Sequence, residues 1–196
     1  MGKRRGLAIN GWLNIDKPSG PTSAAVVGML RRASGAAKVG HGGTLDPLAT
    51  GVLPIAFGEA TKTVAYAMDG RKDYRFAIRW REARTTDDAE GEVMATSDVR
   101  PDADAIRAVL PAFTGEIAQV PPDYSAIKVD GQRAYDLARQ ERPLALEART
   151  VLVERLELVE VPDGDHAVFA ATVGRDRKST RLNSSHVSES RMPSSA

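Results

Sequence analysis

The sequence contains no cysteine among its 196 residues. This absence excludes a disulfide framework, thiolate metal sites and a cysteine nucleophile, and it fits a reducing compartment. No apolar run approaches the roughly 20 residues that a membrane helix needs. The basic start, MGKRRGLAING, is not followed by the apolar stretch of an export signal. We therefore expect a cytoplasmic protein without a membrane partner.

The chain also lacks a large excess of charge of either sign. Its formal net charge of +1 argues against a uniformly basic nucleic-acid binder. The charge is unevenly spread, however, with 10 Lys+Arg against 4 Asp+Glu in residues 1–72 and 12 against 20 in residues 73–173. The positive first part could present phosphate-binding charge, and ordinary scatter of charge on a solvated surface explains it equally well.

Hydrophobic patterning predicts an α+β fold, largely antiparallel, with helices inserted between strands. Pro54 should place its strand at an edge or a bulge. Helices are expected after a cap at Thr22 or Ser23, over EATKTVAYAM, and over DADAIRAVLPAF, capped by Asp102. YSAIKVDGQRAYDLARQ predicts a strand, an Asp-Gly turn and a helix. Further strands are expected for GWLNID, GVLPIAFG and YRFAIRW, and for the hairpin formed by TVLVERLELVEV and HAVFAATV.

The last segment differs in composition from the rest. Residues 174–196 hold seven serines in 23 residues and almost no apolar periodicity, which is typical of disorder. We expect residues 1–10 to form a disordered basic start, residues 11–173 to form one domain, and residues 174–196 to be a non-native or disordered tail. The hypothesis for this tail is a junction or read-through product.

The stretch KVGHGGTLDPLATGVLP, residues 38–54, is read as a loop that carries His41 and Asp46. The other histidines, His166 and His186, do not have metal-ligand spacing with it, so no metal is expected. No nucleophile stands in the strand-turn-helix setting of a serine triad, and the phosphate-binding Gly-Lys-Ser/Thr ending is missing. Asp46 could attack an electrophilic carbon. An Asp-Pro turn with His41 bonded to backbone is the simpler interpretation of these residues.

Four blocks that occur in order along the chain change this interpretation. They are GWLNIDKPSGPTS, VGHGGTLDPLATGVLPIAFGEATK, YRFAIRW with TTDDAEG, and FTGEIAQVPPDYSAIKVDGQRAYDLAR. Together they closely resemble the bacterial tRNA pseudouridine synthase B family, from about Gly11 to Val173. The family's fold is a mixed, largely antiparallel sheet with flanking helices, and the α+β prediction agrees with it.

The resemblance implies an isomerase that converts one uridine in the T-loop of tRNA to pseudouridine, without cofactor or metal. It implies that Asp46 is the catalytic nucleophile, and that tRNA is the partner of a monomeric enzyme. The target base must leave its stack, so an aromatic platform beside a carboxylate makes chemical sense. The residues that the resemblance assigns to substrate binding are His41 at the flipped-out uridine, Tyr74 stacking on the base, Lys17, Gly43, Thr44 and Lys128.

The chain departs from the family after AVFAATV. The family continues with C-S-K-G-T-Y-I-R, whose arginine pairs with the catalytic aspartate, whereas this chain reads GRDRKSTRLNSS. Because that arginine would hold Asp46 ionised, we expect an N-terminal fragment with little or no activity. Arg81 stands where a glycine is usual, and Thr85 where an aspartate is more common. The alternatives are a non-catalytic RNA-binding fragment and a relative of the guide-dependent pseudouridine synthases.

Overall fold

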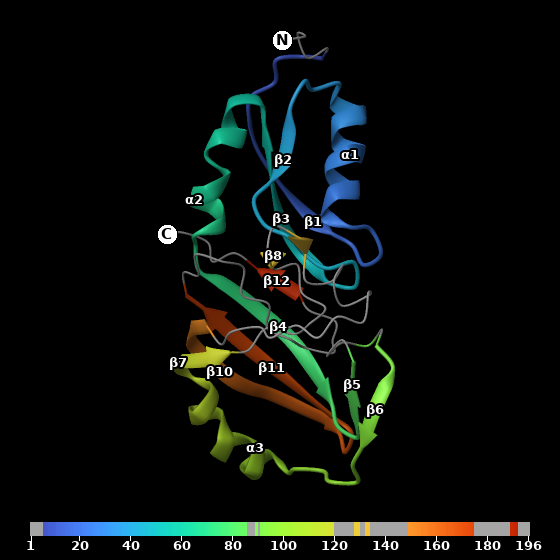
Figure 1. Cartoon of the computed structure of the whole chain (residues 1–196), viewed down its shortest axis with the longest axis vertical. Helices are drawn as coiled ribbons and strands as arrows, with labels where there is room; N and C mark the ends of the chain where they lie inside the picture. The colour runs from blue at the N-terminus through green and yellow to red at the C-terminus, as the bar shows by residue number, and fades with distance from the viewer. Residues whose placement is uncertain are drawn as a thin grey trace. The chain divides into compact units, whose positions relative to one another are not determined.

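The computed structural model describes residues 6–85, 89, 91–119, 128–129, 132–133, 149–174 and 189–191. Contacts between residues divide the chain into two compact units. Unit 1 comprises Met1–Tyr74 and Val187–Ala196, and unit 2 comprises Arg75–His186. Both combine antiparallel strands with short helices (Figure 1), so the predicted α+β class is confirmed. No helix of the described part is long and apolar enough to cross a membrane.

Unit 1 is built around the strand β3 (Thr50–Phe57). The strand β1 (Gly11–Lys17) pairs with β3 in antiparallel fashion over its whole length, and β2 (Val39–His41) pairs with it from Val39↔Phe57 to His41↔Ile55. The other elements of this unit are α1 (Ser23–Ser34), the 3₁₀ helix η1 (Gly58–Lys62), α2 (Val64–Met68), the first residues of β4 (Lys72–Arg79), and β12 (Glu189–Arg191).

The sequence correctly predicts β3 but misplaces Pro54 within the sheet. We expected an edge or a bulge, whereas β3 lies between β1 and β2, and its register with β1 runs without a shift through Asn14↔Pro54. On the other side of β3, pairing with β2 ends at Ile55, and β12 pairs only with Thr50 and Gly51. Pro54 therefore occupies an interruption in the ladder, where a missing N–H is tolerated.

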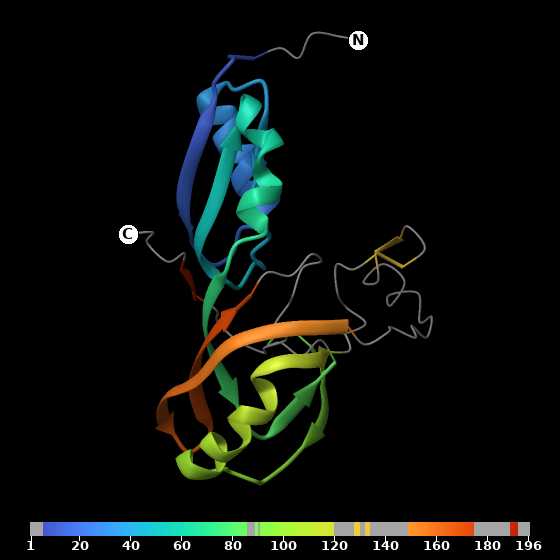
Figure 2. The same cartoon turned by 90° about the vertical axis from the view of Figure 1, so that its left-hand side faces the viewer.

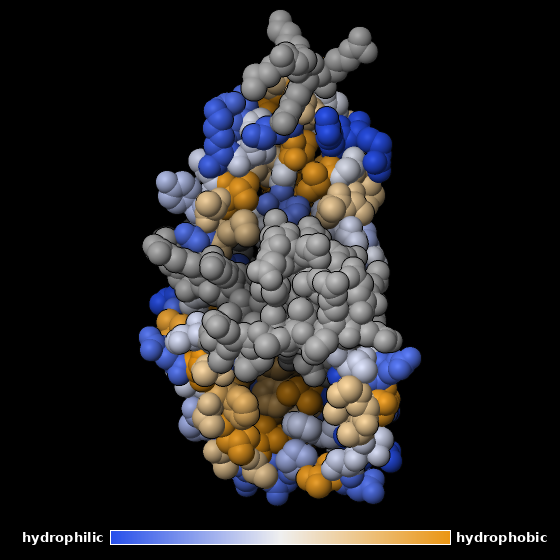
Figure 3. All heavy atoms as spheres, viewed as in Figure 1, coloured by the Kyte–Doolittle hydropathy of each residue, from blue (hydrophilic) through white to orange (hydrophobic). Residues whose placement is uncertain are grey.

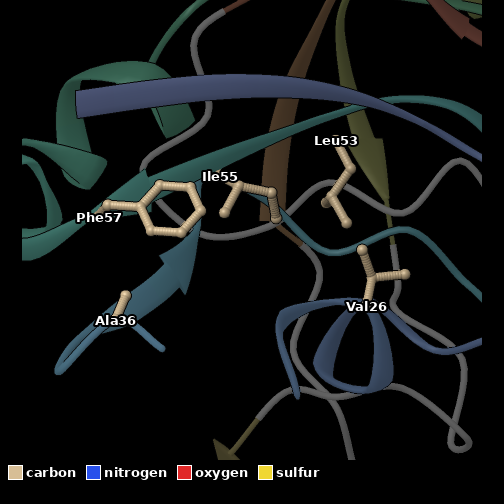
Figure 4. Packing of buried hydrophobic residues seen from close by; sticks show 5 residues of the cluster. All are labelled: Val26, Ala36, Leu53, Ile55 and Phe57. Atoms are coloured by element: carbon tan, nitrogen blue, oxygen red, sulfur yellow. The ribbon is translucent and has the colours of Figure 1, made fainter. Parts of the chain in front are cut away.

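The core of unit 1 forms where α1 packs against β3. Leu53, Ile55 and Phe57 alternate along β3, so they share one face of the sheet, and they cluster with Val26 of α1 and with Ala36 (Figure 4). Thr22 caps the helix by accepting a hydrogen bond from the N–H of Ala25 at 3.0 Å, as one of the two predicted caps. This packing fixes the start of α1 relative to the sheet.

The main sheet of unit 2 contains the rest of β4 and the strands β7 (Gly115–Gln119), β10 (Arg149–Asp163) and β11 (His166–Val173). The strands β10 and β11 form the predicted antiparallel hairpin, and β7 pairs with β10. The helix α3 (Ala103–Val109), capped by Asp102 as predicted, lies against β10 (Figure 2). The remaining elements are η2 (Leu110–Phe113) and the strand pairs β5 (Glu82–Arg84) with β6 (Val93–Thr96) and β8 (Lys128–Val129) with β9 (Gln132–Arg133).

Unit 2 has a core of its own and leaves some apolar side chains at the surface. Phe76 of β4 stacks on Phe169 of β11, with ring centroids 5.5 Å apart. Exposed hydrophobic residues occur in both units (Figure 3), and in unit 2 they include Met94 and Phe113. The helix predicted after the Asp-Gly turn lies outside the described residues. So does most of the tail, and the domain boundaries stay a prediction.

Candidate active site

Asp46 lies in the segment that joins β2 to β3. The side chain of Asp46 is exposed, and its carbonyl oxygen accepts a hydrogen bond from the N–H of Ala49 at 3.1 Å, which closes the Asp-Pro turn. The segment read as one loop from the sequence is therefore shorter, because β2 covers its beginning and β3 starts at Thr50. The turn that offered the simpler interpretation is present, and Asp46 is an exposed residue of it.

A buried serine holds the residue before Asp46. The Ser23 hydroxyl donates to the carbonyl oxygen of Leu45 at 3.0 Å and accepts from the N–H of Leu45 at 2.9 Å. Ser23 is 2 % exposed, and it is the first residue of α1. From the sequence, Ser23 was expected only as a possible helix cap. Because Thr22 is the cap in the structure, the hydroxyl of Ser23 has a different role.

A buried lysine holds the residue after Asp46. Lys17, at the end of β1, is 0 % exposed. Its Nζ donates to the carbonyl oxygens of Pro18 at 2.9 Å, Pro21 at 3.0 Å and Pro47 at 3.2 Å. An ammonium group has three N–H donors, so these three carbonyls use all of them. The N–H of Gly20 also donates to Pro47, at 2.8 Å. Both chain neighbours of Asp46 are thus fixed by the core.

Electrostatic interactions connect Asp46 with two further site residues. Burial lowers the pKa of Lys17, and the carboxylate of Asp46 opposes this effect by favouring the ammonium form. Burial, and to a smaller extent the negative charge of Asp46, raises the pKa of Tyr74 to about 12. Lys17, Asp46 and Tyr74 are therefore close enough to share one electrostatic environment in unit 1, with a neutral phenol at physiological pH.

The glycine-rich part of the loop begins at His41, the last residue of β2. The Nδ1 atom of His41 is buried and has no hydrogen-bond partner among the described residues. Gly42 is packed so tightly that an added Cβ would lie 3.2 Å from the Cβ of Ala67 in α2. Gly43 has φ +146° with open space around it, and Thr44 is exposed. The backbone is therefore accessible to a ligand at Gly43 and Thr44, whereas neighbouring atoms crowd it at Gly42.

Six of the seven predicted site residues lie in unit 1. Lys128, the seventh, lies in β8 of unit 2, and its side chain is outside the described part. Among the described residues, no group of three or more His, Asp or Glu side chains could hold a metal ion. The structure therefore groups Asp46 with Lys17 and Tyr74, and it places His41, Gly43 and Thr44 on the same loop.

An open hollow of about 500 Å³ occurs in unit 2, and none of the residues that line it is among those predicted to be functional. It is lined by the end of β4 and by β5 and β6, and Arg81 is part of its wall. Arg81 has φ +94°, the one positive φ of a non-glycine residue in the described part. This is the position where the sequence comparison expected a glycine, and the backbone conformation explains that preference.

The described residues therefore form an α+β fold in which the loop carrying Asp46 is firmly held and the charge of Asp46 acts on a protonated tyrosine. The chain belongs to the TruB family of pseudouridylate synthases, because the model of that family's N-terminal domain matches residues 31–177. Among curated relatives, the tRNA pseudouridine synthase B of Rhodospirillum rubrum is 61 % identical over 173 residues, covering 88 % of this chain and 56 % of the relative. The corresponding protein of Gluconacetobacter diazotrophicus is 62 % identical over 175 residues, covering 89 % of this chain and 57 % of the relative. The chain spans little more than half the length of these relatives.

Solved structures support the same fold. A Cbf5-Nop10-Gar1 complex contains a chain with a TM-score of 0.65 and 30 % identity, covering 92 % of this chain and 47 % of that one. A second solved structure is that of an H/ACA ribonucleoprotein bound to a substrate RNA containing 2′-deoxyuridine. Its matching chain has a TM-score of 0.59 and 25 % identity, and the match covers 91 % of this chain and 45 % of that one.

Proposed function

We propose that this chain carries the nucleophile-bearing part of a tRNA pseudouridine synthase that isomerises a T-loop uridine, at position 55. The observation that supports this most is the position of Asp46, whose chain neighbours are held by the buried side chains of Ser23 and Lys17. A nucleophile held in this way loses little conformational freedom when it meets its substrate. The relatives named tRNA pseudouridine synthase B support the choice of tRNA.

The chemistry asks little of the protein beyond this carboxylate. The bond between N1 of the base and C1′ of the sugar breaks, the base turns, and C5 bonds to C1′, while the hydrogen on C5 leaves as a proton and N1 takes up a proton. Substrate and product are isomers, so the reaction consumes no oxidant, reductant or transferred group. The carboxylate of Asp46 can act as a covalent nucleophile during this exchange, and we propose that role for it without a cofactor or metal.

Tyr74 is proposed to stack on the flipped-out base. A phenol whose pKa is about 12 stays protonated at neutral pH, so its hydroxyl is a poor general base there. We propose that its ring stacks on the base and that its hydroxyl donates a hydrogen bond. A base on an aromatic face contributes about 1–3 kcal/mol to binding. We therefore favour a platform over proton transfer for this residue.

The other predicted residues divide into loop-shaping and RNA-facing groups. Lys17 uses all its donors within the protein, so we propose that it shapes the cleft indirectly. Gly43 and Thr44 can approach RNA, because the first has open space at its Cα and the second is exposed. His41 is proposed to contact RNA near the flipped uridine, and Lys128 to contact it elsewhere. We also propose a monomer in the cytoplasm, and light scattering of the purified chain tests the first point.

The chain as given is proposed to bind T-loop RNA but to turn it over slowly or not at all. The sequence after Val173 does not contain the family's arginine motif, whose positive charge would stabilise the ionised Asp46. The test is tritium release from C5-labelled uridine in a T-loop transcript, with Asp46→Ala as the control. Background release from both proteins is expected, whereas strong release that Asp46→Ala abolishes contradicts the proposed inactivity.

A second candidate is a guide-dependent synthase, which the similarity to the Cbf5-Nop10-Gar1 complex favours. That similarity comes with 30 % identity, compared with 61–62 % for the relatives named tRNA pseudouridine synthase B. A T-loop stem-loop alone separates the two candidates. A stand-alone enzyme binds it directly, and a guide-dependent one requires a second RNA that pairs with the target.

A further inference from the structure

Ser23 has an arrangement that the helix it begins does not require. Thr22 already supplies the N-cap of α1, through its hydroxyl and the N–H of Ala25. The hydroxyl of Ser23 is therefore available to bond outside the helix, and it does so across 22 positions of sequence. Lys17 and Ser23 are the only buried polar or charged residues among the described part of the chain.

One hydroxyl satisfies both backbone polar groups of Leu45. It donates to the carbonyl oxygen and accepts from the N–H, at 3.0 and 2.9 Å. The residue that precedes Asp46 is thereby held from both of its peptide units. If the hydroxyl is removed, an amide and a carbonyl beside a buried site lose their partner together, which costs more than the loss of an exposed hydrogen bond.

We infer that Ser23 is a positioning residue for Asp46, acting through the backbone of Leu45. The inference rests on the proposed function, because that function gives Asp46 its catalytic role. The hydrogen bonds between Ser23 and Leu45 do not depend on it. Lys17 and Gly20 fix Pro47 on the other side. The two halves of this support come from different elements, because Lys17 ends β1 and Ser23 begins α1. Lys17 of the strand and Ser23 of the helix thus hold the two chain neighbours of Asp46.

The test compares three variants of the chain by nuclear magnetic resonance. Ser23→Ala removes the hydroxyl, Ser23→Thr restores one, and Thr22→Ala is the matched control that removes the helix cap one residue earlier. The readouts are the amide hydrogen exchange of Leu45, the backbone order parameter of Asp46, and the exchange of Leu53 in β3 as a measure of global stability.

In Ser23→Ala, the exchange of Leu45 is expected to speed up by about 10-fold relative to that of Leu53, the size expected for one lost hydrogen bond. The order parameter of Asp46 is expected to fall from about 0.85 to below about 0.6. Thr22→Ala should speed the exchange of both residues equally and leave Asp46 rigid. Ser23→Thr should return the ratio of the two exchange rates to within about 2-fold of the unaltered chain, since one restored hydrogen bond accounts for the difference.

The inference is overturned if Ser23→Ala changes Leu45 and Leu53 in the same proportion, as Thr22→Ala does, or if Asp46 stays rigid without the hydroxyl. None of these measurements needs catalytic turnover or RNA. The outcome of the tritium assay therefore bears on the proposed function alone, and the outcome of these measurements bears on Ser23 alone.

Discussion

The Nζ atom of Lys17 lies 3.2 Å from the carbonyl oxygen of Pro47, the residue that follows Asp46. This contact joins the end of β1 to the loop through a side chain that is 0 % exposed. It is one of three hydrogen bonds from the same ammonium group, and all three acceptors are the backbone carbonyl oxygens of prolines. The lysine thereby ties two proline-containing turns together.

Lys17→Met is therefore expected to destabilise the chain by about 3 kcal/mol, because three carbonyls lose a charged donor. Denaturant unfolding measures the change. Lys62→Met is the matched control, since Lys62 pairs with Glu59 on the surface and such pairs contribute about 0–1 kcal/mol. Equal stability of the two variants contradicts the role assigned to Lys17.

Tyr74 should titrate at unusually high pH in the folded chain. Its pKa is raised to about 12 by burial and then by Asp46, so Asp46→Asn should lower that pKa while burial keeps it above the ordinary value. Ultraviolet absorbance of the phenolate measures this, with Tyr74→Phe used to identify the signal. An unchanged titration in Asp46→Asn shows that the two side chains do not interact.

The same shift makes stability depend on pH in the alkaline range. Between the unfolded pKa of about 10 and the folded value of about 12, the folded state binds the tyrosine proton more strongly than the unfolded state. The contribution of Tyr74 is thus fully present below about pH 10 and is lost as the pH rises towards 12. Tyr74→Phe should unfold with a flatter dependence over this interval, as denaturant titrations at several pH values can show. Parallel curves for the two proteins contradict the shift.

Gly42→Ala should destabilise unit 1 by about 1–3 kcal/mol, the range for overpacking a tight site. The new Cβ would lie 3.2 Å from the Cβ of Ala67 and 3.4 Å from atoms of Pro54 and Trp12. Gly70→Ala is the control, because the nearest atom to its added Cβ is 3.7 Å away and no positive φ is recorded there. Thermal unfolding of the two variants measures the difference in stability. A Gly42→Ala variant as stable as Gly70→Ala contradicts tight packing at Gly42.

Arg81→Gly should stabilise the chain, since φ +94° strains any residue with a Cβ. Relief of about 1 kcal/mol corresponds to a rise of roughly 2–4 °C in the unfolding temperature. Arg79→Gly provides the contrast, because Arg79 lies within the strand β4 and a glycine weakens a strand. A lower unfolding temperature for Arg81→Gly shows that the guanidinium group contributes more than the strain costs.

The sequence predicted most strands and helices of this fold because their signals are local. The alternation in YRFAIRW, the Asp102 cap and the apolar hairpin strands each lie within a short window. Pro54 was misplaced because its tolerance depends on where the pairing of β2 and β12 stops along β3, which no local pattern encodes.

The site was predictable only in part, for a similar reason. Asp46 and Tyr74 were proposed through the resemblance of whole blocks, while spacing alone favoured an ordinary Asp-Pro turn. Ser23 was missed as a site residue because its partner, Leu45, lies 22 positions away. The three hydrogen bonds of Lys17 could not be predicted from the sequence either, because they depend on two proline-containing turns that come together only in the folded chain.

The most direct test of the account is a chain in which residues 1–173 continue into the C-terminal part of the Rhodospirillum rubrum relative, 61 % identical over the matched region. Tritium release from C5-labelled T-loop RNA is the measurement, with Asp46→Asn in the same hybrid. The account predicts release by the hybrid and a loss of about 10³-fold or more in the variant, as for removal of a nucleophile. A hybrid that releases tritium equally well with asparagine at position 46 contradicts it.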